Sequence, residues 1–434
     1  MKNLISYINN KVLVKITSLK TAAVFTRIIA GILTSKAIAV FIGAEGLALV
    51  GNLRNFVAST QTIATLGFYK GVVKYVNDFK NDLVKLSKTL STAYYIGFIT
   101  TIVMSFYCYF NAETINELIF PTYNNYIYII KIFAIVLPFY ALNMFSFSIM
   151  NGFSKYKILI IINIIGQVLG LSIALLLIYQ KNLDGALISV AISESLIFLI
   201  TLVGITNRKS LVPLISVNSV SLSYIKKLSS YTGMALFPAI ILPLVILAIR
   251  SHIIDTIGYK DAGFWEAMLR ISKYYLMLVS SLLGLYIIPR FSEINDIATY
   301  KKEVFSLYKS VIPYFALGLL LIYLLKPFIV WVVFTEEFEP VEDLFLWQLL
   351  GDFVKVLSMI IAYQFLAKKM FWHYIITEAF LVVILYTTSI YFIKIYGVKG
   401  AVIGHFVSYL MYYGVILLIF GSSLFGVESD KTIK

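Results

Sequence analysis

Cysteine and histidine, the residues that most often build nucleophile and metal sites, are scarce in this sequence of 434 residues. There is one cysteine, Cys108, and the three histidines, His252, His373 and His405, lie far apart. A single cysteine excludes a disulfide within the chain, and its apolar neighbours predict a buried, unreactive thiol. The sequence also lacks a glycine-rich loop with a following Lys-Ser/Thr that could cradle phosphate. We therefore expect no enzyme, no cofactor and no metal.

Charged residues are few as well. They make up 13% of the chain, whereas 60% of the residues are hydrophobic, which is more apolar surface than a soluble domain can bury. The 31 tyrosines fit the aromatic belts at the two surfaces of a bilayer. The net charge of +14 would suggest nucleic acid as the partner of a soluble protein, but most lysines here fall in loops between apolar spans. We expect an all-α polytopic membrane protein and no nucleic-acid partner.

Twelve apolar stretches are long enough to cross a bilayer, which takes about 20 residues in a helix. They lie at 19–42, 46–73, 89–110, 126–152, 157–180, 185–206, 228–251, 262–288, 305–334, 344–367, 372–394 and 399–422. The ninth is long, and its end around "KPFIVWVVF" is predicted to be a kinked or interfacial piece.

The loops alternate in charge along the whole chain. Of the 36 basic residues, 22 fall on one side, including both termini, and five fall on the other, where the loops are acidic. Because basic loops stay inside, both termini are expected in the cytoplasm. The lysine-rich residues 1–20 have no short apolar core and no cleavage site, so they are predicted to form an amphipathic lead-in.

The two halves of the chain resemble each other. Pairs of similar features, such as "DGALI" at Asp184 and "KGAVI" at Lys399, lie 213 to 217 residues apart. Six spans followed by six similar spans indicate a parallel repeat, and transporters built this way bind substrate between the halves and rock one against the other. We predict a six-helix lobe at 1–206, a cytoplasmic linker at 207–227 and a second six-helix lobe at 228–434.

Ionisable side chains lie inside the spans despite a cost of roughly 2.5 kcal/mol or more at mid-bilayer. The nine basic ones are Arg27, Lys36, Arg54, Lys70, Lys131, Arg250, Arg270, Lys273 and Lys355. The four acidic ones are Glu194, Glu266, Asp352 and Glu378. The excess of positive charge favours an anionic ligand or bulk water in the interior.

Some of these charges have a simpler explanation. Glu266 and Arg270 are spaced for an i,i+4 ion pair, and Asp352 and Lys355 for an i,i+3 pair that joins helices. Arg27 and Lys36 are nine residues apart, on roughly opposite faces of one helix, so they need not share a ligand.

Proline and histidine inside the spans each leave two interpretations open. Pro238 and Pro243 in the seventh span either make a static kink or form a hinge for alternating access. His405 is either a satisfied interior residue or a proton carrier.

Several segments resemble one transporter family. "FTRIIAGILTSKAIAVFIGAEGLALVGNLRNF", "GVVKYV", "LAIR", "GLYIIPRFSEI" and above all "DLFLWQLLGDFVKV" are similar in content and order to Wzx-type flippases, the O-antigen and lipid III (enterobacterial common antigen) translocases. The resemblance covers nearly the whole chain and places it in the multidrug/oligosaccharidyl-lipid/polysaccharide exporter superfamily.

The resemblance implies twelve transmembrane helices in two pseudo-symmetric six-helix lobes around a V-shaped cavity, as in the multidrug and toxin exporters. It implies that an undecaprenyl-diphosphate-linked oligosaccharide moves from the cytoplasmic to the periplasmic leaflet of a bacterial inner membrane by alternating access, for O-antigen or lipopolysaccharide biosynthesis. A polysaccharide polymerase and a chain-length regulator are expected partners beside membrane lipids. The implied cavity cations are Arg27, Lys36, Arg54, Arg250, Arg270 and Lys273.

Two further points stay open. Glu194, Asp352 and Glu378 are candidates for coupling to proton or sodium entry, or else static pairs. A drug or toxin antiporter of the same fold is the main alternative function, although exporters of cationic drugs need interior carboxylates and the first span has only Arg27 and Lys36. A membrane scaffold or receptor that transports nothing is a third possibility, which the repeat and the embedded charge disfavour.

Overall fold

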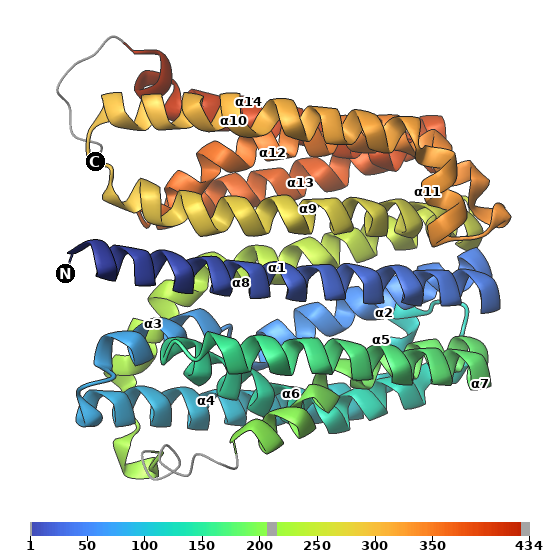
Figure 1. Ribbon diagram of the computed structural model, residues 1–434. Coiled ribbons are helices and arrows are strands. Elements are labelled where there is room, and N and C mark those ends of the chain that lie inside the picture. Colours follow the sequence, from blue (N-terminus) through green and yellow to red (C-terminus); the bar gives the residue numbers. More distant parts are fainter. Residues whose placement is uncertain (1, 206–214, 427–434) are drawn as a thin grey trace. The chain divides into compact units, whose positions relative to one another are not determined.

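The computed structural model describes residues 2–205 and 215–426, and every regular element in these ranges is a helix (Figure 1). The prediction of an all-α fold is therefore confirmed. Ten helices of the described ranges are long and apolar enough to cross a membrane. An α-helix pairs its backbone polar groups internally, as lipid surroundings require. The protein is an integral membrane protein.

Two compact units divide the chain. Unit 1 comprises residues 1–42 and 49–244, and unit 2 comprises 43–48 and 245–434. The division thus falls inside helix α8 (Leu222–Thr256), directly after Leu244. Of the predicted linker at 207–227, residues 207–214 lie outside the described ranges, and the lobe boundaries drawn from the sequence stay a prediction.

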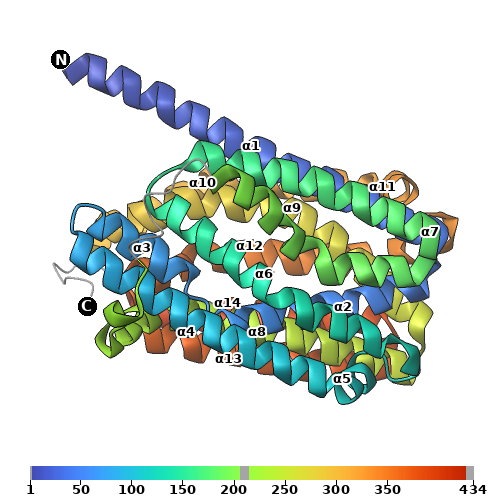
Figure 2. The same ribbon diagram turned by 90° about the horizontal axis from the view of Figure 1, so that it is seen from below.

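Unit 1 is built around α6, which packs on α3, α4 and α7, while α1 packs on α7 (Figure 2). Its elements are α1 (Lys2–Phe41), most of α2 (Gly43–Ala64), α3 (Tyr69–Phe79), α4 (Leu83–Phe110), α5 (Ala112–Ile119), η1 (Asn124–Tyr126), α6 (Ile127–Gly152), α7 (Tyr156–Ile205), η3 (Val217–Ser219) and the first part of α8.

Helix α7 is interrupted where the sequence predicts a connection between two spans. Asn182 has a φ of 47° and a ψ of −120°, a positive φ that lies outside the helical regions and breaks the helix. A Cβ on Gly185 would lie 1.9 Å from the Leu177 carbonyl oxygen, so the chain can pass here only without a side chain. The ten membrane-crossing helices include α7 as one helix and do not include α2. The twelve predicted spans therefore stay a prediction.

In unit 2, α12 packs on α9, α10 and α14, and α13 packs on α14. The elements are the rest of α8, α9 (Tyr259–Glu293), α10 (Ile297–Leu324), α11 (Lys326–Val333), η4 (Glu336–Leu344), α12 (Phe345–Ala367), α13 (Phe371–Tyr396) and α14 (Lys399–Phe425). The predicted break in the ninth span is confirmed, because α10 ends at Leu324 and α11 begins at Lys326.

Aspartates begin two of the long helices. Asp82 accepts a hydrogen bond from the backbone N–H of Lys85 at the start of α4, and Asp296 accepts one from Thr299 at the start of α10. The pKa of Asp82 is lowered chiefly by hydrogen bonding to Lys85, and that of Asp296 by the Thr299 N–H. Both loops are thereby tied to the first turn of the helix that follows.

Candidate functional site

The predicted cations of unit 1 differ in exposure. Arg27 on α1 is exposed, whereas Lys36 on α1 and Arg54 on α2 are partly buried. Arg27 and Lys36 are about 13.5 Å apart along the helix axis, at 1.5 Å per residue. A single phosphate is too small to contact both side chains at their opposite faces, so these two residues would contact different parts of a ligand.

Helix α2 is held on both sides of Arg54. The Asn52 side chain donates a hydrogen bond to the Ile119 carbonyl oxygen at 2.9 Å, and Ser59 donates one to the Ile240 carbonyl oxygen at 3.0 Å. Both side chains are buried. These bonds fix the rotation of α2 about its axis and therefore the direction in which Arg54 points.

In unit 2, one carboxylate holds two of the predicted cations. Glu266 accepts a hydrogen bond from Arg270 Nε at 2.9 Å and a second one from Arg250 Nη2. The predicted Glu266–Arg270 pair is thus confirmed. The Arg250 guanidinium also lies 5.5 Å from the Trp265 ring centroid. All three charges are buried, with Arg250 fully enclosed, and the cluster carries a net charge of +1.

Lys273 differs from the residues of this cluster in its exposure to solvent. It lies on α9 less than one turn after Arg270, and its side chain is exposed, whereas Arg270 is buried. The predicted cations of unit 2 are therefore of two kinds: two are enclosed and bound to Glu266, and one is accessible.

Among the carboxylates of unit 2 that the structure describes, Asp352 on α12 is the most completely enclosed. It is fully buried and accepts hydrogen bonds from Ser272 Oγ at 2.5 Å, from the Tyr275 hydroxyl and from Gln348 Nε2 at 3.2 Å. His405 Nε2 on α14 lies 3.0 Å from its other oxygen. Its partner on α14 is therefore His405. A buried carboxylate needs such a set of partners, since an unpaired charge is very costly there.

The remaining charged residues of this region are linked to Asp352 through aromatic side chains of α14. The Lys355 ammonium lies 5.1 Å from the Tyr409 ring centroid, and the Tyr412 hydroxyl donates to Glu378 Oε1 at 3.1 Å. The Tyr409 ring in turn packs on His405, 4.8 Å away. Asp352, Lys355 and Glu378 thus lie in one polar layer between α12, α13 and α14.

A glycine makes the approach of α14 possible. A Cβ on Gly351 would lie 2.3 Å from His405 Cδ2, far inside van der Waals contact. Only glycine at this position lets His405 reach the carboxylate of the next residue, Asp352.

Exposure separates the other two predicted coupling residues. Glu194 on α7 is exposed, whereas Glu378 is partly buried and bound to Tyr412. Of the three acidic candidates, Asp352 alone is fully enclosed. Within the described ranges, no three His, Cys, Asp or Glu residues are grouped so as to hold a metal ion.

The sequence did not lead us to several residues of these clusters: Trp265, Ser272, Tyr275 and Gln348. For Gln348 a signal exists, since it precedes Asp352 by one helical turn and shares its face. Arg250 and Glu266 are 16 residues apart on successive helices, and no helical period links them. Polar contacts between helices depend on tertiary packing, which a sequence pattern does not show.

Comparison with known proteins identifies the family. Residues 37–343 match the polysaccharide biosynthesis protein family. The chain belongs to this family. It is 26% identical over 415 residues to the lipid III flippase of Escherichia coli (strain K12), with 93% of this chain and 97% of that protein covered. The lipid III flippase of Shigella flexneri is similar to the same degree and extent.

Solved structures show a fold that this chain shares with known transporters. An inward-facing multidrug resistance MATE family transporter of the MOP superfamily superimposes with a TM-score of 0.69 at 14% identity, covering 91% of this chain and 95% of that one. The lipid II flippase MurJ, in an inward closed conformation, gives 0.68 at 15% identity, with 94% and 87% covered. The expected exporter-like fold is thus confirmed.

Proposed function

We propose that this protein is a flippase that moves a lipid-linked oligosaccharide across a membrane. The observation that carries the proposal is the similarity to lipid III flippases along 93% of the chain, together with the family match. The relatives are named as flippases and transporters, so transport is favoured over catalysis.

The cargo in this proposal is a polyprenyl (undecaprenyl) diphosphate that carries the oligosaccharide. A diphosphate has about two negative charges, and guanidinium and ammonium groups are its natural partners. Arg27, Lys36, Arg54, Arg250, Arg270 and Lys273 supply the cationic chamber. We expect the direct contacts from the more accessible ones, Arg27, Lys36, Arg54 and Lys273, because Arg250 and Arg270 are enclosed with Glu266.

Movement follows alternating access, with α8 as the hinge. Pro238 and Pro243 each remove a helical hydrogen bond, and the division between the two compact units follows Pro243 by one residue. The carbonyl oxygen of Ile240, between the two prolines, is held by Ser59. Because the Ser59 hydrogen bond fixes α8 at Ile240, we expect the helix to bend beside this residue, at the prolines.

The driving force has two possible sources. The membrane potential, negative inside, pushes an anion outward, and two charges over 100 mV are worth roughly 4 to 5 kcal/mol. Coupling to proton or sodium entry would use Asp352, Glu378 or Glu194. The contact between His405 and the fully buried Asp352 favours Asp352, because it joins two ionisable side chains of different helices, α12 and α14. The buried Asp352 also supports the alternative function, a drug or toxin antiporter, because exporters of cationic drugs need interior carboxylates.

Location and partners follow from the same proposal. We place the protein in the bacterial inner membrane with both termini in the cytoplasm, as the distribution of basic loops predicts. The flipped cargo would pass to a polysaccharide polymerase and its chain-length regulator, in O-antigen or a related lipopolysaccharide pathway.

Charge reversal of Arg54 tests the proposal. In a strain that lacks its own flippase, Arg54→Glu should reduce surface glycan to background, since a carboxylate repels the diphosphate. Lys80→Glu, at an exposed position beyond α3, should keep wild-type export, and immunoblots should show equal amounts of both variants. Full export by Arg54→Glu would refute Arg54 as a contact of the diphosphate, whereas failure of the wild-type protein to restore surface glycan would refute the flippase proposal. Resistance to cationic drugs conferred by the wild-type protein would favour the antiporter.

A further inference from the structure

The apolar span predicted at 46–73 is broken between α2 and α3 in unit 1. The Gly67 N–H donates to the Thr62 carbonyl oxygen at 3.2 Å, and the Leu66 N–H donates to that of Ile63 at 3.0 Å. This pair of hydrogen bonds ends a helix and needs a left-handed residue, which is usually glycine. Here that residue is Leu66, with a φ of 51°, so the break is strained at this position.

The same four-residue pattern lies inside a continuous helix of unit 2. Residues 66–69 read "LGFY", and residues 283–286 read "LGLY", 217 residues later, which is a spacing of the internal repeat. Helix α9 runs through its copy of the pattern without a break, from Tyr259 to Glu293. The pattern Leu-Gly-x-Tyr is therefore compatible with both conformations, and contacts with other helices decide which one forms.

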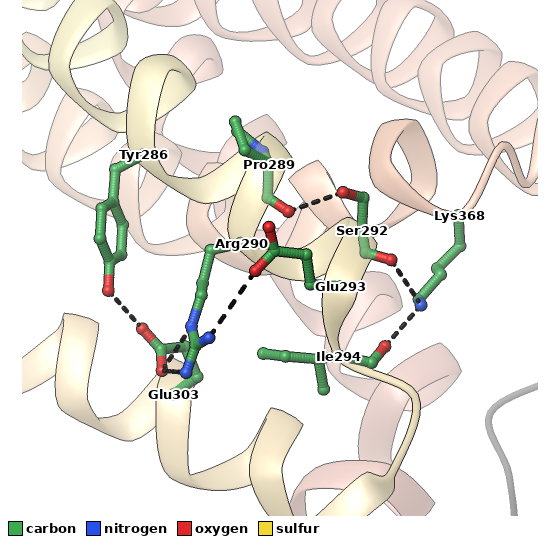
Figure 3. Close-up of polar contacts among 8 residues, drawn as sticks. All are labelled: Tyr286, Pro289, Arg290, Ser292, Glu293, Ile294, Glu303 and Lys368. Carbon is green, nitrogen blue, oxygen red and sulfur yellow. Dashed lines mark hydrogen bonds and ion pairs between the residues drawn. The ribbon is translucent and has the colours of Figure 1, made fainter. Parts of the chain in front are cut away.

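In unit 2 a polar latch holds the part of α9 that follows the pattern. The Tyr286 hydroxyl donates to Glu303 Oε1 at 2.8 Å, and Arg290 Nε donates to Glu303 Oε2 at 3.3 Å. The Lys368 ammonium donates to the carbonyl oxygen of Ile294, the residue directly after α9 (Figure 3). These contacts tie the end of α9 to α10 and to the residue that follows α12.

Unit 1 has a different set of contacts at this place. Equivalent points of the two units, such as the helix caps Asp82 and Asp296, fix the matching positions. The positions in unit 1 that match the three charged residues of the latch hold Val73, Thr89 and Phe153. Helix α3 buries Val72 and Val76 in an apolar cluster with Leu228 of α8. Apolar contacts have no fixed direction, so they permit α3 to shift.

Helix α4 offers partners for both conformations. In a continuous helix the Ala64 carbonyl oxygen would accept the Phe68 N–H. At the break the hydroxyls of Thr100 and Thr101 both lie 2.9 Å from this oxygen, which needs a partner inside a membrane. Each hydroxyl can also donate to the Gly97 carbonyl oxygen of its own helix, at 3.0 and 2.7 Å. The threonines therefore stay satisfied if Ala64 returns to its helical partner.

A small cavity beside the break provides room for movement. It has a volume of about 40 Å³, enough for one or two waters. Its wall includes Thr65 and Tyr69 at the break, Tyr94 of α4 and Phe145 of α6. The Tyr69 hydroxyl accepts a hydrogen bond from Asn151 at 3.0 Å, which a shift of α3 would break. Because protein interiors are otherwise closely packed, this space lets side chains at the break move without displacing a neighbouring helix.

We propose that residues 65–68 are a reversible hinge, at which α2 and α3 join into one continuous helix in a second state of unit 1. In that state the Ala64 carbonyl oxygen accepts the Phe68 N–H, and Leu66 leaves its left-handed conformation. Helix α3 is then the movable segment, whereas the latch keeps its counterpart in α9 in place. The inference goes beyond the proposed function, because it concerns unit 1 alone and holds whatever the cargo.

Spin labels within unit 1 test the hinge in the full-length protein with Cys108→Ser in nanodiscs. The labels replace Asp78 at the end of α3 and Glu117 on α5, both exposed. Helix α5 is tied to α2 by the hydrogen bond from Asn52 to Ile119, so the pair spans both helices. A straight helix is longer from end to end than a bent one. We therefore expect two distances from double electron–electron resonance, the longer one from the continuous helix.

Two variants should shift the populations in opposite directions. Thr100→Val with Thr101→Val removes the hydroxyls that hold the Ala64 carbonyl oxygen, so the population at the longer distance should gain about tenfold over the other. Leu66→Gly relieves the strain of the break and should favour the shorter distance about tenfold. The matched control, Thr100→Ser with Thr101→Ser, keeps both hydroxyls and should give the wild-type distribution.

The hinge is overturned if all variants give one unchanged distance, because the break is then static. If the valine variant does not fold, Leu66→Gly decides alone, and a wild-type distribution that it leaves unchanged refutes the hinge. Labels at Glu293 and Val332 in unit 2 should give one distance, and two distances there would refute the latch. Export by Arg54→Glu has no bearing on these distances, so the hinge and the flippase proposal stand or fall separately.

Discussion

At the scale of single residues, the charges inside the helices are of two kinds. Arg250, Arg270 and Asp352 are enclosed and bound to named partners, whereas Arg27 and Lys273 are exposed. An enclosed charge keeps its partner because neither group can exchange it for water. The enclosed charges therefore fix the structure around them, and the exposed ones are accessible from outside.

The Glu266 cluster gives the clearest prediction at this scale. Glu266→Gln removes the negative charge that Arg250 and Arg270 share and leaves both buried guanidiniums without this carboxylate. Because breaking a buried pair leaves an uncompensated charge, we expect the free energy of unfolding to fall by about 3 kcal/mol. Thermal melting of the purified protein in one detergent measures this.

An exposed pair in the same unit serves as the control. Lys260 and Glu337 are 3.6 Å apart, with side chains 57% and 37% exposed. Solvent screens such a pair, so Glu337→Gln should cost less than about 1 kcal/mol. Equal melting of the two variants would mean that Glu266 does not compensate the arginines.

At the scale of helices, close approach decides which polar groups meet. Gly351 lets α14 come near enough for His405 to reach Asp352, and Gly185 lets α7 pass the Leu177 carbonyl. Both glycines stand beside residues that the sequence singled out, Asp352 and Asp184 respectively. Because glycine has no side chain, the neighbouring segments can approach each other closely at these two points.

Gly351→Ala tests this close approach. The new methyl group would overlap the His405 ring, so α14 must move away and the His405–Asp352 contact must lengthen. We expect a loss of 1 to 3 kcal/mol, about the cost of overpacking a core. The double variant Gly351→Ala with His405→Ala should recover part of that loss, because the overlapping ring is gone. Gly421→Ala, whose Cβ meets no atom within 4 Å, should melt like the wild type.

At the scale of the whole molecule, the sequence predicted the helical membrane fold, the break before Lys326 and the connection near Asn182. These follow from local patterns: apolar length, proline and turn residues. The partners of the buried charges were predictable only within one helix, as for Glu266 and Arg270. Contacts across helices, such as that of Arg250 with Glu266, depend on how the helices pack. The apolar periodicity of the sequence does not predict this packing.

The division between the two units leads to a prediction about motion. If α8 bends near Pro243, replacing both prolines restores two helical hydrogen bonds and stiffens the helix. Pro238→Ala with Pro243→Ala should then slow glycan export about tenfold at unchanged protein level. Cargo binding should be unaffected, because neither proline carries a charged or hydrogen-bonding side chain.

Spin labels measure the motion itself. After Cys108→Ser removes the only cysteine, labels at Tyr179 in unit 1 and Tyr396 in unit 2, which are 72% and 55% exposed, report the distance between the units. We expect a broad or two-peaked distance distribution that narrows in the double proline variant. Pro313→Ala removes a proline from α10, entirely within unit 2, and should leave the distribution unchanged. The hinge is refuted if the double variant keeps the wild-type distribution, since α8 would then bend equally well without its prolines.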